Sequence, residues 1–291
     1  MGQQRRRRDR RAETPKRMQL TERDIAIVEG VHRFRVLRQD QIQQLYFGPR
    51  NKSGAQRRLE RLYDHGFLER RFLPVMVGRS PTLYVLDRRG AELLRTARGY
   101  DELVWYGSSK QLKTDFLEHT LAINDVLVAV TLACRQLGYE LETWHTESQL
   151  KARIDRVTVY TASGRRESVP VVPDSFFTVI AHGRRYPFFL ELDRGTMTLA
   201  RFKIKVQGYT AYYRSGAYQE RYGLRSMRVL TVTLGEERLA HLKAATEGAG
   251  GREWFWFALL GELRPETVLS APVWWVAQRQ ERAPLIRPPD V

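Results

Sequence analysis

Three carboxylates in the middle of the sequence have the spacing of a metal-binding acid cluster. Asp174 follows Pro173 within an apolar segment, and Glu191 and Asp193 end the apolar segment 186–193. Residues two apart on a strand share a face, so Glu191 and Asp193 are expected to project together. Carboxylates that converge repel each other and lose hydration, and a divalent cation between them relieves that cost. These acids therefore predict a Mg²⁺ or Mn²⁺ site that could polarise a phosphodiester.

The surrounding sequence predicts the elements that would hold these acids. Apolar periodicity indicates an αβββαβ order with one further helix and strand, over residues 112–137, 139–145, 169–180, 186–192, 199–213, 227–234, 236–245 and 254–259. Asp174 then lies in the second strand, and Glu191 and Asp193 close the third. A hairpin between these strands would bring all three acids to one edge of the sheet.

Residues 18–98 predict a different module, a winged helix-turn-helix. Three short amphipathic helices begin near Thr21, Arg38 and Ser53, two strands at 67–73 and 83–86 form a wing, and a helix over 89–97 closes the module. The second helix of such a pair enters the major groove of DNA. Arginine and glutamine can read bases or hold phosphates there. The predicted DNA-binding residues are Lys52, Gln56, Arg57, Arg58 and Arg61 on the third helix and Arg70, Arg71 and Arg79 in the wing.

The charge distribution also favours double-stranded DNA as a partner. Of the net charge of +16, residues 1–17 carry +6 and residues 18–98 carry +7, so the remainder of the chain carries only +3. A basic segment of this kind points to a polyanion, although a solvated surface would have the same composition. Residues 1–17 are predicted to be a disordered basic tail that can grip phosphates.

Composition constrains the remaining expectations. The single cysteine, Cys134, cannot form an intrachain disulfide or a cysteine-based zinc site, which suits the cytoplasm. We identify no secretory signal and no apolar run long enough to span a bilayer, so no membrane partner is expected. Residues 99–111 are interpreted as a linker, 112–275 as the second domain and 276–291 as an irregular tail. A homodimer is left open.

The acid motif resembles the PD-(D/E)xK nuclease superfamily, which is a restriction-endonuclease-like fold. The resemblance implies that Asp174 and Glu191 bind metal and that Glu118, on the preceding helix, supplies another acid. The position of the catalytic lysine is occupied by Asp193, so Lys203 or Lys205 on the following helix would have to replace it. Whether such a domain is a Mg²⁺-dependent endonuclease or nickase is left open.

The whole chain, over about residues 18–260, resembles the replication-relaxation family of plasmids and other mobile elements. The resemblance rests on a winged helix followed by Leu-Glu-His-Thr-Leu-Ala-Ile-Asn-Asp (117–125), Val-Pro-Asp (172–174) and Glu-Leu-Asp-Arg-Gly-Thr (191–196). It implies an accessory role in replication, relaxation or mobilisation, alongside other proteins of those processes.

Three functions are compatible with these features of the sequence. The first is a DNA-binding accessory protein with a nuclease-like second domain, the second a metal-dependent nickase or endonuclease, and the third a transcriptional regulator with a dimerisation domain. Without a metal, Arg194 and Arg201 could pair with Glu191 and Asp193 in a surface network.

Overall fold

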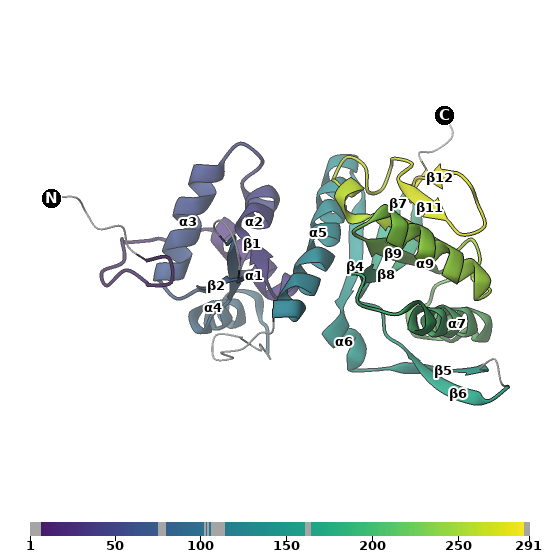
Figure 1. The fold of residues 1–291 in the computed structure, drawn as a ribbon. Coiled ribbons are helices and arrows are strands. Elements are labelled where there is room, and N and C mark those ends of the chain that lie inside the picture. Colours follow the sequence, from purple (N-terminus) through teal and green to yellow (C-terminus); the bar gives the residue numbers. More distant parts are fainter. Residues whose placement is uncertain are drawn as a thin grey trace. The chain divides into compact units, whose positions relative to one another are not determined.

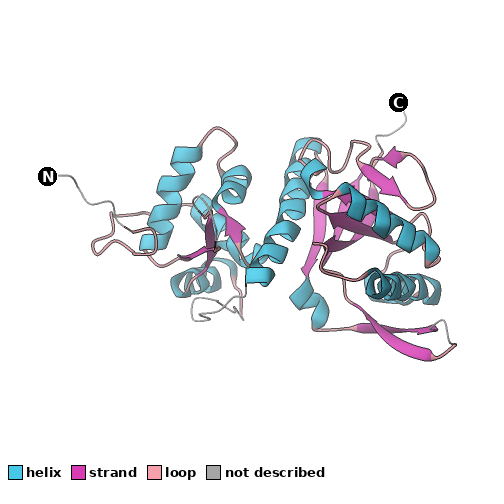
Figure 2. Cartoon of the chain, viewed as in Figure 1, coloured by secondary structure: helices cyan, strands magenta, loops and turns pink. Residues whose placement is uncertain are grey.

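The protein divides into two compact units, Met1–Asn124 and Asp125–Val291. A computed structural model describes residues 7–74, 80–101, 103, 105, 114–160 and 164–287. The first unit holds helices and a small sheet, and the second holds a larger mixed sheet with helices (Figures 1 and 2). The protein is thus of the mixed α+β class that the sequence predicts. The linker predicted at 99–111 lies mostly outside the described residues.

The first unit has the predicted succession of three helices, a hairpin and a closing helix. Its elements are α1 (Glu22–Phe34), β1 (Leu37–Arg38), α2 (Gln39–Tyr46), α3 (Lys52–Asp64), β2 (Leu68–Phe72), β3 (Thr82–Leu86) and α4 (Arg88–Arg98). The strands form an antiparallel sheet in the order β1-β3-β2. The two-residue strand β1 was not predicted, because so short a segment carries no alternating pattern.

Local chemistry fixes the ends and the packing of these helices. Thr21 and Asp24 form a reciprocal capping box that starts α1, as their spacing predicts. Helix α3 begins after Asn51, whose side chain accepts from the Gly54 amide, so the capping residue predicted at Ser53 is two residues late. At Gly30 a β-carbon would collide with the hydroxyl of Tyr46, so glycine is what allows α2 to approach α1 this closely.

Residues 7–17 are not the disordered tail that their composition predicts. Arg11 pairs with Glu69 at 2.8 Å and with Asp87, and the Ala12 amide donates to Asp64 at 3.0 Å. Arg8 donates to the Ser80 carbonyl at 3.0 Å. These ion pairs and hydrogen bonds anchor the segment to the hairpin and to α3, which composition alone could not reveal.

The second unit is built on a seven-stranded sheet in the order β12-β11-β10-β9-β8-β7-β4. The strands are β4 (Glu140–Thr146), β7 (Ser175–Ala181), β8 (Arg184–Asp193), β9 (Arg228–Thr233), β10 (Phe255–Leu259), β11 (Trp274–Val276) and β12 (Arg282–Ala283). Helix α5 (Thr114–Leu137) spans the division, because its first half belongs to the first unit. The helices that lie wholly in the second unit are α6 (Glu147–Lys151), α7 (Leu199–Ser215), α8 (Ala217–Tyr222) and α9 (Glu236–Gly248), with a 3₁₀ turn at Leu260–Glu262. The succession α5-β4-β7-β8-α7-β9 has the predicted αβββαβ order.

The register of the central strands positions the site. Strand β7 pairs antiparallel with β8, and β8, β9 and β10 run parallel to one another. The carboxyl ends of these three strands therefore lie at one edge of the sheet and their amino ends at the other. Phe176, Phe189, Phe255 and Phe257 pack with α7 and α9 in one buried core, and those helices lie together on one face of the sheet (Figure 1).

Two boundaries predicted for the second unit are wrong. The strand expected over 169–180 is interrupted, because β6 (Arg166–Val171) pairs with β5 (Asp155–Tyr160) in a separate hairpin and β7 begins only at Ser175. The tail expected at 276–291 contains β12, and Leu285 and Ile286 in it are buried. Both segments gain their structure from partners distant in sequence.

Helix α5 is long and apolar enough to cross a membrane, by length and composition alone, so the expectation that no apolar run reaches that length is wrong. Within the structure, 61% of its most apolar window is buried. Cys134 on this helix is also buried, and burial raises the pKa of its thiol to about 11. These features are those of a core helix.

Candidate functional site

The structure brings Asp174 and Glu191 together at the carboxyl end of β8. Asp174 immediately precedes β7 and continues its ladder with β8, because its amide donates to the Leu190 carbonyl at 3.0 Å and its carboxylate accepts from the Leu192 amide at 2.7 Å. Glu191 lies between those two residues and is only 5% exposed. Burial is the largest cause that raises the pKa of Glu191, and the negative charge of Asp174 adds to the rise.

Helix α7 supplies the groups that face Glu191. Lys205 forms an ion pair with one carboxylate oxygen, and the Tyr209 hydroxyl donates to the other. Burial raises the pKa of Glu191 to about 7, although the Lys205 ammonium and the Tyr209 hydrogen bond oppose that rise. Burial acts to lower the pKa of Lys205, but Glu191 and Asp174 outweigh it and the pKa is raised. Lys205 is thus held as a cation, paired with Glu191 and further stabilised by the charge of Asp174.

Asp193 belongs to a different interaction. Both of its oxygens accept from Arg238 on α9 at 2.8 Å, in the bidentate arrangement that suits guanidinium and carboxylate. One of them also accepts from the Gly195 amide at 2.8 Å, and Arg238 donates further to the Met197 carbonyl at 2.6 Å. Asp193 therefore fixes the turn after β8 to α9. It shares a sheet face with Glu191 but not its partners.

The two lysines predicted for this site differ in their placement. Lys203 is exposed on α7, so of the two predicted substitutes only Lys205 reaches the carboxylates. Glu118 belongs to the first unit and the acid pair to the second. Lys205, Tyr209 and Arg238 are partners of Glu191 and Asp193, and neither Tyr209 nor Arg238 was predicted as such from the sequence.

The carboxylates do not fit the divalent metal site that their sequence motif implies. Both oxygens of Glu191 and both of Asp193 already accept hydrogen bonds from the protein, and the Lys205 ammonium stands where a cation would be needed. Within the described residues, no group of three or more His, Cys, Asp or Glu side chains could hold a metal ion. A cation would have to displace Lys205 from its carboxylate partners.

A metal titration checks this assignment. We expect millimolar Mn²⁺ to give no saturable binding that depends on Asp174 and Glu191, since Lys205 and Tyr209 already occupy the carboxylate oxygens of Glu191. Calorimetric titration of the wild type against Asp174→Ala and Glu191→Ala measures it. Saturable binding in the wild type that either substitution abolishes would contradict the assignment and restore the metal site.

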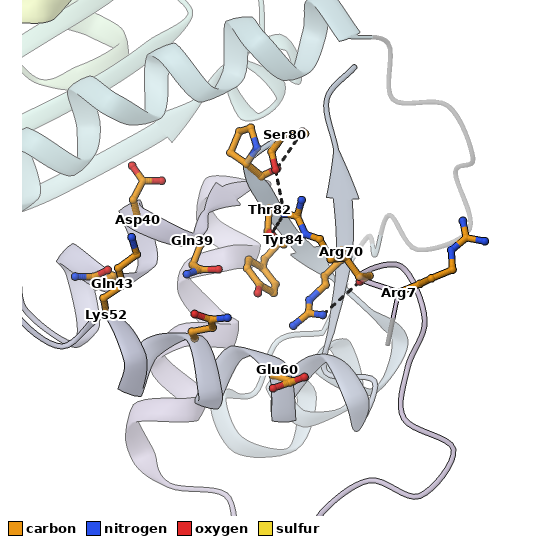
Figure 3. Close-up of a pocket in the computed structure, with 13 residues that line it drawn as sticks. Arg7, Gln39, Asp40, Gln43, Lys52, Glu60, Arg70, Ser80, Thr82 and Tyr84 are labelled. Atoms are coloured by element: carbon orange, nitrogen blue, oxygen red, sulfur yellow. Dashed lines mark hydrogen bonds between the residues drawn. The ribbon is translucent and has the colours of Figure 1, made fainter. Parts of the chain in front are cut away.

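The first unit presents a separate polar cleft of about 620 Å³ between α2, α3 and the hairpin. Lys52, Gln56 and Glu60 line it from α3, one helical turn apart. Gln39, Asp40 and Gln43 face them from α2, and Arg7, Arg8, Arg70, Ser80, Pro81, Thr82 and Tyr84 complete the lining. Figure 3 shows these side chains around the cleft. Sequence reasoning missed Glu60 and the α2 glutamines, although their spacing of four residues could have indicated them.

The predicted DNA-binding residues of α3 divide into two groups. Lys52, Gln56, Arg57 and Arg61 are exposed, and Arg57 and Arg61 line a smaller hollow beside Glu60 and Asp64. Arg58 points inward instead. Its guanidinium binds the carboxylate of Asp24, with Nε 2.5 Å from Oδ1, and donates to the Gln19 carbonyl at 2.7 Å. Arg58 is therefore half-buried and committed to an ion pair that joins α3 to α1.

The predicted hairpin arginines also differ from one another. Arg70 lies over the ring of Tyr63 at 4.3 Å and donates to the Arg8 carbonyl at 3.3 Å, so it holds the N-terminal segment while lining the cleft. Arg71 is half-buried on the same strand. Arg79 lies outside the described residues.

The structure defines a mixed α+β protein with a basic, helix-rich first unit and a mixed-sheet second unit. Residues 29–227 match the replication-relaxation family, and the chain belongs to that family. No curated protein matches the chain. Among solved structures, restriction endonuclease FokI is similar with a TM-score of 0.30 and 12% identity over 83% of this chain. The chain spans 42% of FokI, and a likeness this distant does not bear on function.

Proposed function

We propose that this protein is a DNA-binding accessory protein of the replication, relaxation or mobilisation of a plasmid or other mobile element. In this proposal the first unit is a winged helix-turn-helix, α3 enters the major groove of duplex DNA, and the β2–β3 hairpin is the wing. The protein acts in the cytoplasm, and other replication or mobilisation proteins are its further partners. Family membership supports the biological setting.

The outer face of α3 is the observation that carries the proposal. Lys52, Arg57 and Arg61 are exposed there and, among the described residues, make no ion pair. Unpaired cations on an exposed helix suit phosphate contacts, and Gln56 beside them can pair with adenine. Glu60 on the same face can accept from cytosine, so the cleft in Figure 3 offers both donors and acceptors to base edges.

The second unit is proposed as a restriction-endonuclease-like domain that has lost metal-dependent cleavage. Its strand order and the position of Asp174 and Glu191 resemble a nuclease core, but Lys205, Tyr209 and Arg238 occupy the carboxylate oxygens. This pairing favours a binding or scaffolding role over a nickase. A transcriptional regulator would share the first unit and differ in its target.

A matched pair of double substitutions tests the proposal. Arg57→Ala with Arg61→Ala should weaken binding to a labelled duplex and lower the slope of log K against log salt by about 1.8, since each lost phosphate contact removes about 0.9. Arg88→Ala with Arg95→Ala removes the same charge from exposed positions on α4 and serves as the control. If the α3 pair changes the slope no more than the α4 pair, α3 is not the DNA-contacting helix.

A further inference from the structure

A second cleft, of about 1050 Å³, opens in the second unit at the amino ends of the parallel strands. It is lined by the starts of β8, β9 and β10 and by the segment that follows β12. Glu191 lies at the other end of β8, seven residues from Arg184. The acid pair is therefore roughly 23 Å from Arg184 in the cleft, measured along the strand. The cleft is therefore separate from the site described above.

The charges that line this cleft are almost all positive. Five arginines face a single carboxylate, and the arginines are Arg184, Arg185, Arg228, Arg279 and Arg287. Two of them have acidic partners, since Arg279 pairs with Glu253 at 2.9 Å and Arg185 pairs with Glu142. Arg184 and Arg287 are exposed and have no acidic partner among the residues that the structure describes.

Arg228 forms the floor of the cleft. Its guanidinium lies 4.8 Å from the ring centre of Trp256 and 5.8 Å from that of Tyr186, and it donates to the Leu285 carbonyl. Burial lowers the pKa of Arg228, and the neighbouring charge of Arg287 lowers it further while Tyr186 opposes the change. Arg228 and Arg287 both line the cleft, and a bound anion would relieve the repulsion between their charges.

The extent of the cleft indicates the kind of anion. It crosses β8, β9 and β10, and adjacent strands are about 4.8 Å apart, so its floor extends over roughly 10 Å. That span exceeds one phosphate group and suits successive phosphates of a strand. Guanidinium groups bind phosphate in bidentate fashion and need no base identity to do so.

We propose that this cleft binds the phosphate backbone of a nucleic-acid strand, as a second contact that does not depend on α3. The rings of Trp254 and Trp256 are largely packed, Trp254 against Tyr213 and Trp256 under Arg228. Base stacking is therefore a minor part of the binding, and the contact carries little sequence preference. A protein with both surfaces could hold two segments of DNA.

Substitution of the two unpaired arginines tests the proposal in the full-length chain. Arg184→Gln with Arg287→Gln should lower the salt slope of DNA binding by about 1.4 on a single strand or about 1.8 on a duplex, if each arginine neutralises one phosphate. Arg214→Gln with Arg264→Gln removes equal charge from exposed positions of the same unit outside the cleft. Fluorescence anisotropy with labelled single-stranded and duplex oligonucleotides of the same sequence measures both pairs.

The same measurement in the Arg57→Ala, Arg61→Ala background separates the two sites. We expect the cleft substitutions to lower the slope of log K against log salt by the same amount in that background as in the wild type, because the cleft and α3 contact nucleic acid independently. A loss confined to one oligonucleotide would identify the strand that the cleft holds. If the cleft pair matches its control on both oligonucleotides, the proposal is overturned, whatever the result for α3.

Discussion

Replacing Arg58 with methionine is expected to destabilise the first unit by about 1.5–3 kcal/mol, the cost of removing a hydrogen-bond partner from a charged group. The Asp24 carboxylate would keep the hydrogen bonds that the Thr21 amide and hydroxyl donate to it. Asp24 is 0% exposed and the Arg58 side chain is 17% exposed, so neither group has much water to replace the other. Burial acts to raise the pKa of Asp24, yet Arg58 and Thr21 outweigh it and the pKa is lowered. The carboxylate therefore remains ionised in the fold and depends on the guanidinium.

Chemical denaturation monitored by circular dichroism measures this effect. Arg57→Met is the matched control, because Arg57 is the adjacent arginine of α3 and is exposed, where substitutions usually change stability by less than about 0.5 kcal/mol. Adding Asp24→Asn to Arg58→Met should restore part of the lost stability, since the uncompensated charge is then removed. Equal effects of Arg57→Met and Arg58→Met would show that the ion pair is not structural.

This result also bears on DNA binding. The sequence places Arg57, Arg58 and Arg61 together as groove-facing arginines, whereas the structure commits Arg58 to Asp24. If all three arginines were substituted, a loss of DNA binding could come either from unfolding of the first unit or from lost contacts between α3 and DNA. The double substitution of Arg57 and Arg61 avoids that confusion, which is why it is the proper test of α3.

Local sequence signals predicted most of the fold. The capping box of Thr21 and Asp24 and the αβββαβ order each depend on residues close in sequence. The same is true of the pairing that brings Asp174 beside Glu191, because one hairpin joins their strands. Where a short connection fixes the geometry, spacing and apolar periodicity are sufficient.

The partners of the acids could not be predicted in the same way. Arg238 lies 45 residues from Asp193, and Arg58 lies 34 residues from Asp24, so tertiary packing alone decides which arginine meets which acid. The sequence offered the nearby Arg194 and Arg201 as candidates and gave no signal for Arg238, which α9 brings to Asp193. The β5–β6 hairpin was missed because Gly164 and its neighbours hide an alternating pattern inside an irregular stretch.

Substituting Glu191 with glutamine is expected to change how stability depends on pH. The pKa of Glu191 is about 7 in the folded protein against 4.5 as the ordinary value, so the folded state binds the proton more tightly. The stability that this group contributes therefore rises as pH falls from about 7 to about 4.5. A difference of this size corresponds to roughly 3 kcal/mol. Glutamine cannot titrate, so the Glu191→Gln variant should lack this gain in stability at lower pH.

The free energy of unfolding of the wild type relative to Glu191→Gln should therefore increase as pH falls through the neutral range. Comparing slopes removes any constant offset from the altered contacts of Lys205 and Tyr209. Glu247→Gln is the control, because the Lys243 contact and the Gln278 amide outweigh burial and lower the pKa of Glu247. The stability that the Glu247 carboxylate contributes is lost only under more acidic conditions. Parallel pH profiles of wild type and Glu191→Gln would mean that Glu191 stays ionised at neutral pH, with Lys205 fully compensating its burial.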